Sequence, residues 1–140
     1  MYTRITFFLF AAVAASIVAA QTPTVRIVPV SRTSPASGQE MFNNYCAACH
    51  GKQGRGDGPA AAAMTKVPPD LSRIAARNNG KFPDLHVLNA ISGNEPMAAH
   101  GSADMPAWGE VLRSLNSGTS DTVLLRLSNL TDYVKSLQVK

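Results

Sequence analysis

Apolar residues near the C-terminal end of the chain recur at intervals of three and four residues. They are Val123, Leu127, Leu130, Val134 and Leu137. Residues at this spacing share one face of an α-helix, because the helix has about 3.6 residues per turn. The pattern predicts an amphipathic helix that begins at the capping residue Ser120 or Asp121 and packs its apolar face into the core.

A second helix is predicted at the start of the folded part. In "SGQE", Ser37 and Glu40 have the spacing of a capping box, in which each side chain binds a backbone N–H near the helix start. This helix would carry Phe42 and Tyr45 and end at the glycines that follow His50.

Three short helices are predicted between these two. "PPDLSRIAA" has Asp70 as its cap, "PDLHVLNAISG" begins at Asp84 and ends near Gly93, and "WGEVLRSL" forms the third. The residues expected to face inward are Leu71 and Ile74 in the first of these helices, and Leu85, Leu88 and Ile91 in the second. No persuasive alternation of apolar and polar residues predicts a strand, so the expected fold class is all-α.

The N-terminus differs from the rest of the chain. Arg4 precedes the apolar run "ITFFLFAAVAASIV", and the small residues of "VAA" suit cleavage after Ala20. Residues 1–20 are therefore predicted to be a secretory signal peptide. An uncleaved membrane anchor is the alternative, although the run is short for a span that needs about 20 residues. Residues 21–36 are rich in Pro, Ser and Thr and are expected to form an extended lead-in. Residues 37–140 are expected to form one small domain.

Charge is distributed unevenly along the 140 residues. From position 21 to 81 there are eight basic and three acidic residues, and from 82 to 140 there are four basic and six acidic residues. A basic half favours partners with an acidic face, although an ordinarily solvated surface explains it equally well. No aromatic-interleaved basic motif accompanies these charges, so no nucleic-acid partner is expected.

The segment from position 51 to 81 is dense in Gly, Pro, Ala and charged residues. Such a segment supplies few large apolar side chains, and the predicted helices around it are short. We therefore expect that something other than side chains fills the centre of the fold.

Both cysteines lie in "CAACH", where Cys46, Cys49 and His50 form a Cys-x-x-Cys-His motif. This is the attachment motif of c-type haem, in which each thiol adds to one vinyl group and the histidine can bind the iron. A thioredoxin-like pair would need a βαβ pattern, a disulfide would leave His50 unexplained, and zinc would lack a second pair of ligands. One covalent haem c per chain is therefore expected, with His50 as an iron ligand.

The chain resembles the small, exported bacterial class I c-type cytochromes over roughly Ser37 to Gln138. The resemblance rests on "CAACHG", "GDGPA", "PPDL", "DMPAWG" and a last helix that ends in "YVKSLQ". It implies a cytochrome c-like fold of few short helices wrapped around the haem, with the first helix crossing the last. Gly38 and Phe42 would then meet the helix that carries Tyr133, and the glycine would let the two backbones approach closely.

A second iron ligand is sought among the remaining methionines and histidines. The candidates are Met41, Met64, Met97, Met105, His86 and His100. Met105 is favoured because Pro106 biases its backbone away from helix, which suits a loop that delivers a thioether to the haem. "DMPAWG" also matches the ligand loop of similar cytochromes. Met97 is the second choice, followed by a histidine or an open site.

Further residues are expected beside the haem. In similar cytochromes a proline carbonyl binds the ring N–H of the iron-bound histidine, and Pro59 in "GDGPA" matches that position unless it only shapes the turn. Trp108, the single tryptophan, is expected to close the pocket with its N–H near a haem propionate, or to pack in the core. Leu71, Leu88 and Ile91 are expected to contact the porphyrin.

A haem with two protein ligands would have no vacant position for a substrate but could pass an electron through its exposed edge. We therefore expect a periplasmic electron carrier rather than an enzyme. The carrier would contact a membrane only if the leader is uncleaved. Its redox protein partners would dock on a basic rim that includes Lys52, Arg55 and Lys81. The alternatives are a cytochrome subunit of a larger dehydrogenase or oxidase, and a haem enzyme or gas sensor with an open sixth site.

Overall fold

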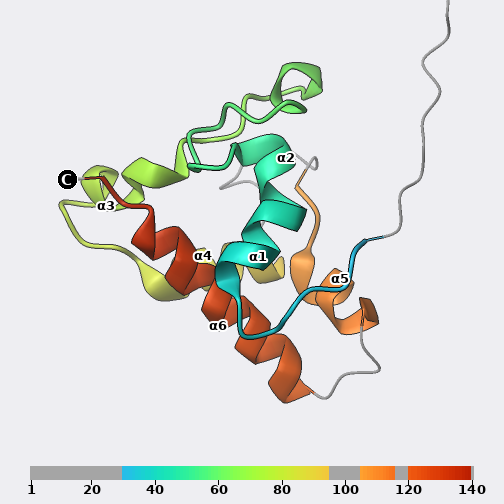
Figure 1. The fold of residues 1–140 in the computed structure, drawn as a ribbon. Coiled ribbons are helices and arrows are strands. Elements are labelled where there is room, and N and C mark those ends of the chain that lie inside the picture. Colours follow the sequence, from blue (N-terminus) through green and yellow to red (C-terminus); the bar gives the residue numbers. More distant parts are fainter. Residues whose placement is uncertain (1–29, 95–104, 116–119, 140) are drawn as a thin grey trace, which may run out of the picture.

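The computed structural model describes residues 30–94, 105–115 and 120–139 (Figure 1). Regular structure in these ranges is entirely helical, which confirms the predicted all-α class. In chain order the elements are α1 (Gly38–Met41), a π-helical turn (Phe42–Cys46), α2 (Ala47–His50), a 3-10 turn (Ala61–Ala63), a second 3-10 turn (Leu71–Arg73), α3 (Ile74–Arg77), α4 (Asp84–Ser92), α5 (Trp108–Leu115) and α6 (Ser120–Ser136). The predicted signal peptide, Met97 and His100 lie outside the described residues.

The first helical segment runs without a break from α1 through the π-helical turn into α2. Ser37 caps it as predicted, because its Oγ accepts a hydrogen bond of 3.1 Å from the backbone N–H of Glu40. The second half of the predicted capping box is wrong, because the N–H of Ser37 donates to the Ser34 carbonyl and the Glu40 carboxylate accepts from the backbone N–H of Ser34 at 3.2 Å. This bond ties the preceding turn to the helix start. The segment ends at Gly51, whose φ of 74° suits a glycine.

The start of α1 lies against α6 (Figure 1). A Cβ atom at Gly38 would overlap the backbone carbonyl of Asn129 and lie 2.9 Å from Cβ of Tyr133. The rings of Phe42 and Tyr133 pack beside this point with centroids 5.2 Å apart and planes tilted by 53°. The expected crossing of the first and last helices is therefore present, and it requires a glycine at position 38.

The middle helices begin where their caps predict. Asp70 accepts a hydrogen bond of 2.9 Å from the backbone N–H of Ser72, which starts the 3-10 turn that leads into α3. Leu71 and Ile74 are half-buried against the core, as expected for the inner face of this segment.

α4 begins at Asp84 and ends at Gly93, which is left-handed with a φ of 85°, as the sequence predicts. Its inner face differs from the expectation. Leu85 is 71% exposed, whereas Val87 and Ile91 are buried. The prediction that Leu85 faces inward is wrong because the buried stripe of α4 starts two residues later and follows the i, i+4 spacing from Val87.

α6 buries four of the five residues that predicted it, namely Val123, Leu127, Leu130 and Val134. The fifth, Leu137, is half-buried just beyond the helix end. Arg126, which the apolar pattern does not include, is also buried on this helix. Among the described residues no helix has the length and apolar composition needed to cross a bilayer.

Candidate functional site

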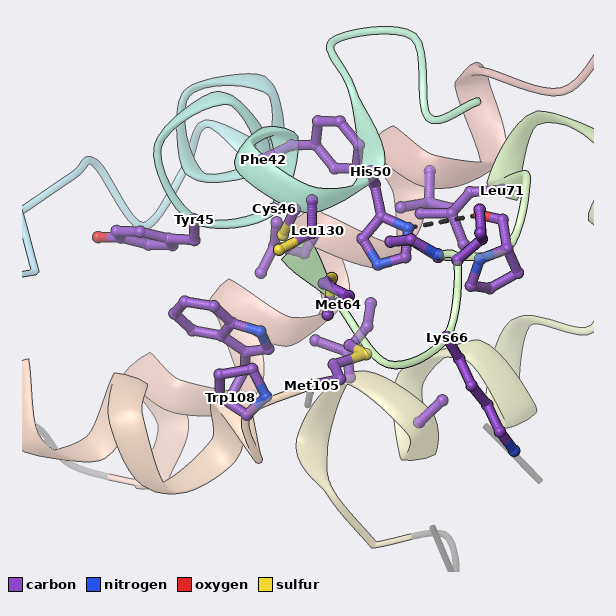
Figure 2. Close-up of a pocket in the computed structure, with 18 residues that line it drawn as sticks. Phe42, Tyr45, Cys46, His50, Met64, Lys66, Leu71, Met105, Trp108 and Leu130 are labelled. Carbon is purple, nitrogen blue, oxygen red and sulfur yellow. Dashed lines mark hydrogen bonds between the residues drawn. The ribbon is translucent and has the colours of Figure 1, made fainter. Parts of the chain in front are cut away.

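A pocket lies among the helices, where the sequence indicated that side chains alone would not fill the core. It is lined mainly by apolar side chains from α2, α4, α6 and the segments that lead into the Leu71 turn and into α5 (Figure 2). Its empty volume, including the part open to solvent, is about 920 Å³. The lining is mainly apolar with few polar groups, which suits a large apolar cofactor better than a metal ion.

One wall of the pocket carries the Cys-x-x-Cys-His motif. Cys46 ends the π-helical turn, Cys49 and His50 lie in α2, and all three line the pocket. The following loop folds back on this helix, where the N–H groups of Gly56 and Gly58 donate to the carbonyls of His50 and Cys49 at 2.8 and 3.2 Å. Because the last carbonyls of a helix lack partners within it, the loop stabilises the helix end that presents the motif.

His50 is 8% exposed, and its Nδ1 lies 3.4 Å from the carbonyl oxygen of Pro69 (Figure 2). With the proton on Nδ1 this contact is a hydrogen bond, and Nε2 keeps its lone pair. The prediction that Pro59 supplies the carbonyl is wrong. Pro59 is exposed because its loop returns to the end of α2, whereas the segment that contains Pro68 and Pro69 passes beside the imidazole.

The environment of the cysteines does not suit disulfide exchange. Burial, with a smaller contribution from neighbouring Cys49, raises the pKa of Cys46 to about 12. A redox-active thiol pair needs a lowered pKa, so a thioredoxin-like role is not supported. Within the described ranges no group of three His, Cys, Asp or Glu side chains is arranged to hold a metal ion.

Met105 and Trp108 form part of the opposite wall. Met105 is half-buried and Trp108 is 9% exposed, and Figure 2 shows Met105 on the side of the pocket opposite His50. The Trp108 ring stacks on Tyr45, with centroids 5.3 Å apart and planes 20° from parallel. Met64 also lines the pocket, so two thioether side chains reach the same space.

The other candidates from the sequence divide into two groups. Leu71 and Ile91 line the pocket, as expected for apolar neighbours of a cofactor. Leu88 does not line the pocket. It lines a separate groove between α4 and α6, because the inner face of α4 is formed by Val87 and Ile91. Met41 is fully buried in the core, and His86 is exposed on α4, so neither lines the pocket.

Several lining residues were placed on the predicted helices by the sequence, but they were not predicted to lie beside the cofactor. They are Phe42, Tyr45, Leu130 and Val134. Periodicity identifies a buried face but does not distinguish a side chain that packs on protein from one that packs on a cofactor. The sequence signal that points to a cofactor is the shortage of large apolar residues between positions 51 and 81. This shortage indicates a core that needs an additional group.

The chain matches the Cytochrome c family over residues 35–116, more than half of its 140 residues. It therefore belongs to the cytochrome c family, and its fold is that of a c-type cytochrome. No match was found among curated proteins or among solved structures. Members of this family carry covalent haem c, serve in electron transfer and generally work outside the cytoplasm.

The residues that line the pocket fit haem c. A porphyrin needs an apolar pocket, two thiols at one edge and an imidazole beside them, and the pocket provides each of these. Cys46 and Cys49 would hold haem c through thioether bonds, and the haem would supply a one-electron couple to the protein.

Proposed function

We propose that this cytochrome is a one-electron carrier that binds a single haem c through Cys46 and Cys49, with His50 and Met105 as the two iron ligands. The observation that carries the proposal is the arrangement of the pocket, in which the imidazole and the Met105 thioether lie on opposite sides (Figure 2). Two protein ligands leave no open position for a substrate, so electron transfer is the chemistry that remains.

The role of His50 depends on its hydrogen bond. The Pro69 carbonyl holds the proton on Nδ1, which fixes the ring orientation and directs Nε2 into the pocket. The bond also raises the basicity of the imidazole and so strengthens it as a ligand. The apolar lining excludes water, and together with a thioether ligand this favours the reduced state, giving a higher potential than two histidine ligands would.

Met105 is favoured over Met64 by the chain around each residue. Met64 lies in the segment that continues to Pro69, the partner of His50, whereas Met105 belongs to the separate segment that leads into α5. Pro106 disfavours helix at Met105, which keeps this residue in the non-helical bend that precedes α5.

The test compares Met105→Ala with Met64→Leu as the matched control. Met105→Ala should open the sixth position, lower the potential and let carbon monoxide bind the ferrous protein. Met64→Leu should keep the weak far-red absorption band of ferric iron bonded to methionine sulfur. The assignment is wrong if that band survives in Met105→Ala. Rapid carbon monoxide binding by the unmutated protein would instead favour the gas sensor or haem enzyme.

We further propose that redox partners with an acidic face dock beside the pocket, on a basic rim that includes Lys52, Arg55 and Lys81. These side chains are exposed, and exposed Lys66 also lines the pocket. Oxidation and reduction by an anionic probe, the hexacyanoferrate couple, should slow as ionic strength rises, whereas a cationic hexaammineruthenium probe should not. Lys52→Gln, Arg55→Gln and Lys81→Gln should each weaken the anion effect more than Arg113→Gln, a charge removal on α5. Equal effects would exclude the rim as the docking site.

Export through a cleaved signal peptide completes the proposal. Intact mass spectrometry of the purified protein should give the chain from Gln21 onward plus the mass of one haem. A mass that retains residues 1–20 would support a membrane anchor. A larger complex that persists at high salt would instead identify the chain as a subunit of a dehydrogenase or oxidase.

A further inference from the structure

The segment that precedes α1 is held to the protein by a buried hydrogen-bond network. The Tyr45 hydroxyl lies 2.6 Å from the carbonyl of Ser31 and 2.7 Å from Oγ1 of Thr33. From α6, Arg126 donates to the Thr33 carbonyl at 2.8 Å and to Thr33 Oγ1 at 3.1 Å. Nearby, the Asn129 amide donates to the carbonyl of Pro35 at 2.8 Å. The segment therefore crosses α6 on its way to α1 (Figure 1).

The protons in this network can be placed by counting donors. Tyr45 has one hydroxyl proton, and the Ser31 carbonyl can only accept, so Tyr45 donates to Ser31. Thr33 Oγ1 accepts from Arg126 and therefore has its own proton available for Tyr45 Oη. Each hydroxyl thus donates one bond and accepts one bond, which fixes the direction of the chain from Arg126 to Ser31.

The network is built from residues that are costly to bury. Thr33 and Tyr45 are each 8% exposed and Arg126 is 2% exposed. A buried guanidinium is tolerated only when several acceptors surround it, and here Thr33 supplies two. An apolar residue at position 126 would fill the space without this cost, so the hydrogen bonds are the feature that arginine adds.

Tyr45 connects this network to the pocket. Its ring lines the pocket and stacks on Trp108 with centroids 5.3 Å apart, while its hydroxyl points away from the pocket (Figure 2). Trp108 also lines the pocket and lies three residues after Met105. Any movement of the Tyr45 ring therefore removes support from Trp108 and from the segment that carries Met105.

We propose that Thr33, Tyr45 and Arg126 form a latch that positions Trp108 and keeps that side of the haem pocket closed to external ligands. The latch depends on the proposed function in one respect only, namely that a haem occupies this pocket. It makes Tyr45 a positioning residue, and it gives the segment before α1 a role in protecting the haem.

The test measures how fast imidazole binds to the ferric protein. Tyr45→Phe keeps the stacked ring but removes the hydroxyl, and Thr33→Val removes the bridging Oγ1 at similar volume. Each change should raise the binding rate at least about tenfold, because it removes two hydrogen bonds of the network and the loss of one corresponds to about that factor in the population of the open state. The rate increase in the double variant should fall short of the product of the two single increases, because both changes remove the same Thr33–Tyr45 hydrogen bond.

Two variants serve as controls. Thr131→Val removes another buried threonine hydroxyl from α6, whose hydrogen bond runs within the helix to the Leu127 carbonyl at 2.9 Å. Tyr133→Phe removes a tyrosine hydroxyl from the ring that packs on Phe42. Both should leave the imidazole rate unchanged even where they lower the unfolding midpoint, which separates a latch from general loss of stability.

The outcomes distinguish the two proposals. If the starting protein has no methionine-bonded iron, the proposed ligation fails, yet the ratio of variant to unmutated binding rates still tests the latch. If the iron is methionine-bonded and Tyr45→Phe and Thr33→Val bind imidazole no faster than the controls, the latch is refuted. Independent, multiplicative effects of the two changes would also refute it, because they would show that the residues do not act through one chain.

Discussion

Substitution of alanine for Gly38 provides a sharp test of the helix crossing that frames the pocket. In an isolated helix this change is favourable, because alanine has a higher helix propensity than glycine by about 1 kcal/mol. In this protein the added Cβ would overlap the backbone carbonyl of Asn129 and lie 2.9 Å from Cβ of Tyr133. Neither atom can rotate away, so α1 and α6 must separate.

The size of the effect follows from these two opposing terms. Overpacking in a close contact costs about 1–3 kcal/mol, and a contact against rigid backbone belongs at the upper end of that range. After subtraction of the helix propensity, the free energy of unfolding should fall by about 1–2 kcal/mol. For a typical urea dependence this lowers the unfolding midpoint by roughly 0.5–1 M.

The assay is urea unfolding of the ferric haem protein, followed by far-ultraviolet circular dichroism and by the haem absorption. Gln39→Ala, at an exposed position in the same helix, is the control and should change the free energy of unfolding by less than about 0.5 kcal/mol. If Gly38→Ala proves as stable as the unmutated protein, or more stable, the close crossing of α1 and α6 is not present.

Two further changes test the helix caps and the surface charges. Ser37→Ala removes the acceptor of the Glu40 N–H and should lower stability by about 1 kcal/mol in urea unfolding, with an unchanged dependence on denaturant. The hydrogen bond of 2.7 Å from Lys135 lowers the pKa of the Asp84 carboxyl in the folded protein. The stabilisation from this pair is therefore fully present above the pKa of the unfolded chain, about 4, and is lost as the pH falls through the lower pKa of the folded protein. Asp84→Asn should therefore be slightly less stable than the unmutated protein at pH 6 and equal to it near pH 2, and a difference that persists at pH 2 would contradict this origin.

The sequence predicted those parts of the fold that depend on local chemistry. Caps at Ser37 and Asp70 and the left-handed Gly93 act on their immediate neighbours, and each appears where expected. The four-and-three spacing of α6 was equally informative, because 17 consecutive helical residues average out single exceptions. In the nine-residue α4 the same reasoning misplaced Leu85, since a short helix has too few turns to define its inner face.

Contacts between distant segments were harder to predict. Pro59 and Pro69 both follow the attachment motif, and only the path of the intervening loop decides that Pro69 reaches His50. Arg126 was hidden for a similar reason. A lone arginine in an amphipathic helix is expected at the surface, and its burial depends on Thr33, which lies 93 residues away. The motif itself carried the cofactor prediction because its chemistry is contained within five consecutive residues.

The measurement that tests the central claim most directly is a spectroelectrochemical titration of the purified protein, with carbon monoxide added to the reduced form at the end. We expect one covalent haem, a single one-electron step, low-spin spectra in both oxidation states and no reaction with carbon monoxide. Absence of haem, or a high-spin ferrous form that binds carbon monoxide at once, would contradict the assignment of this protein as an electron carrier with a closed iron site.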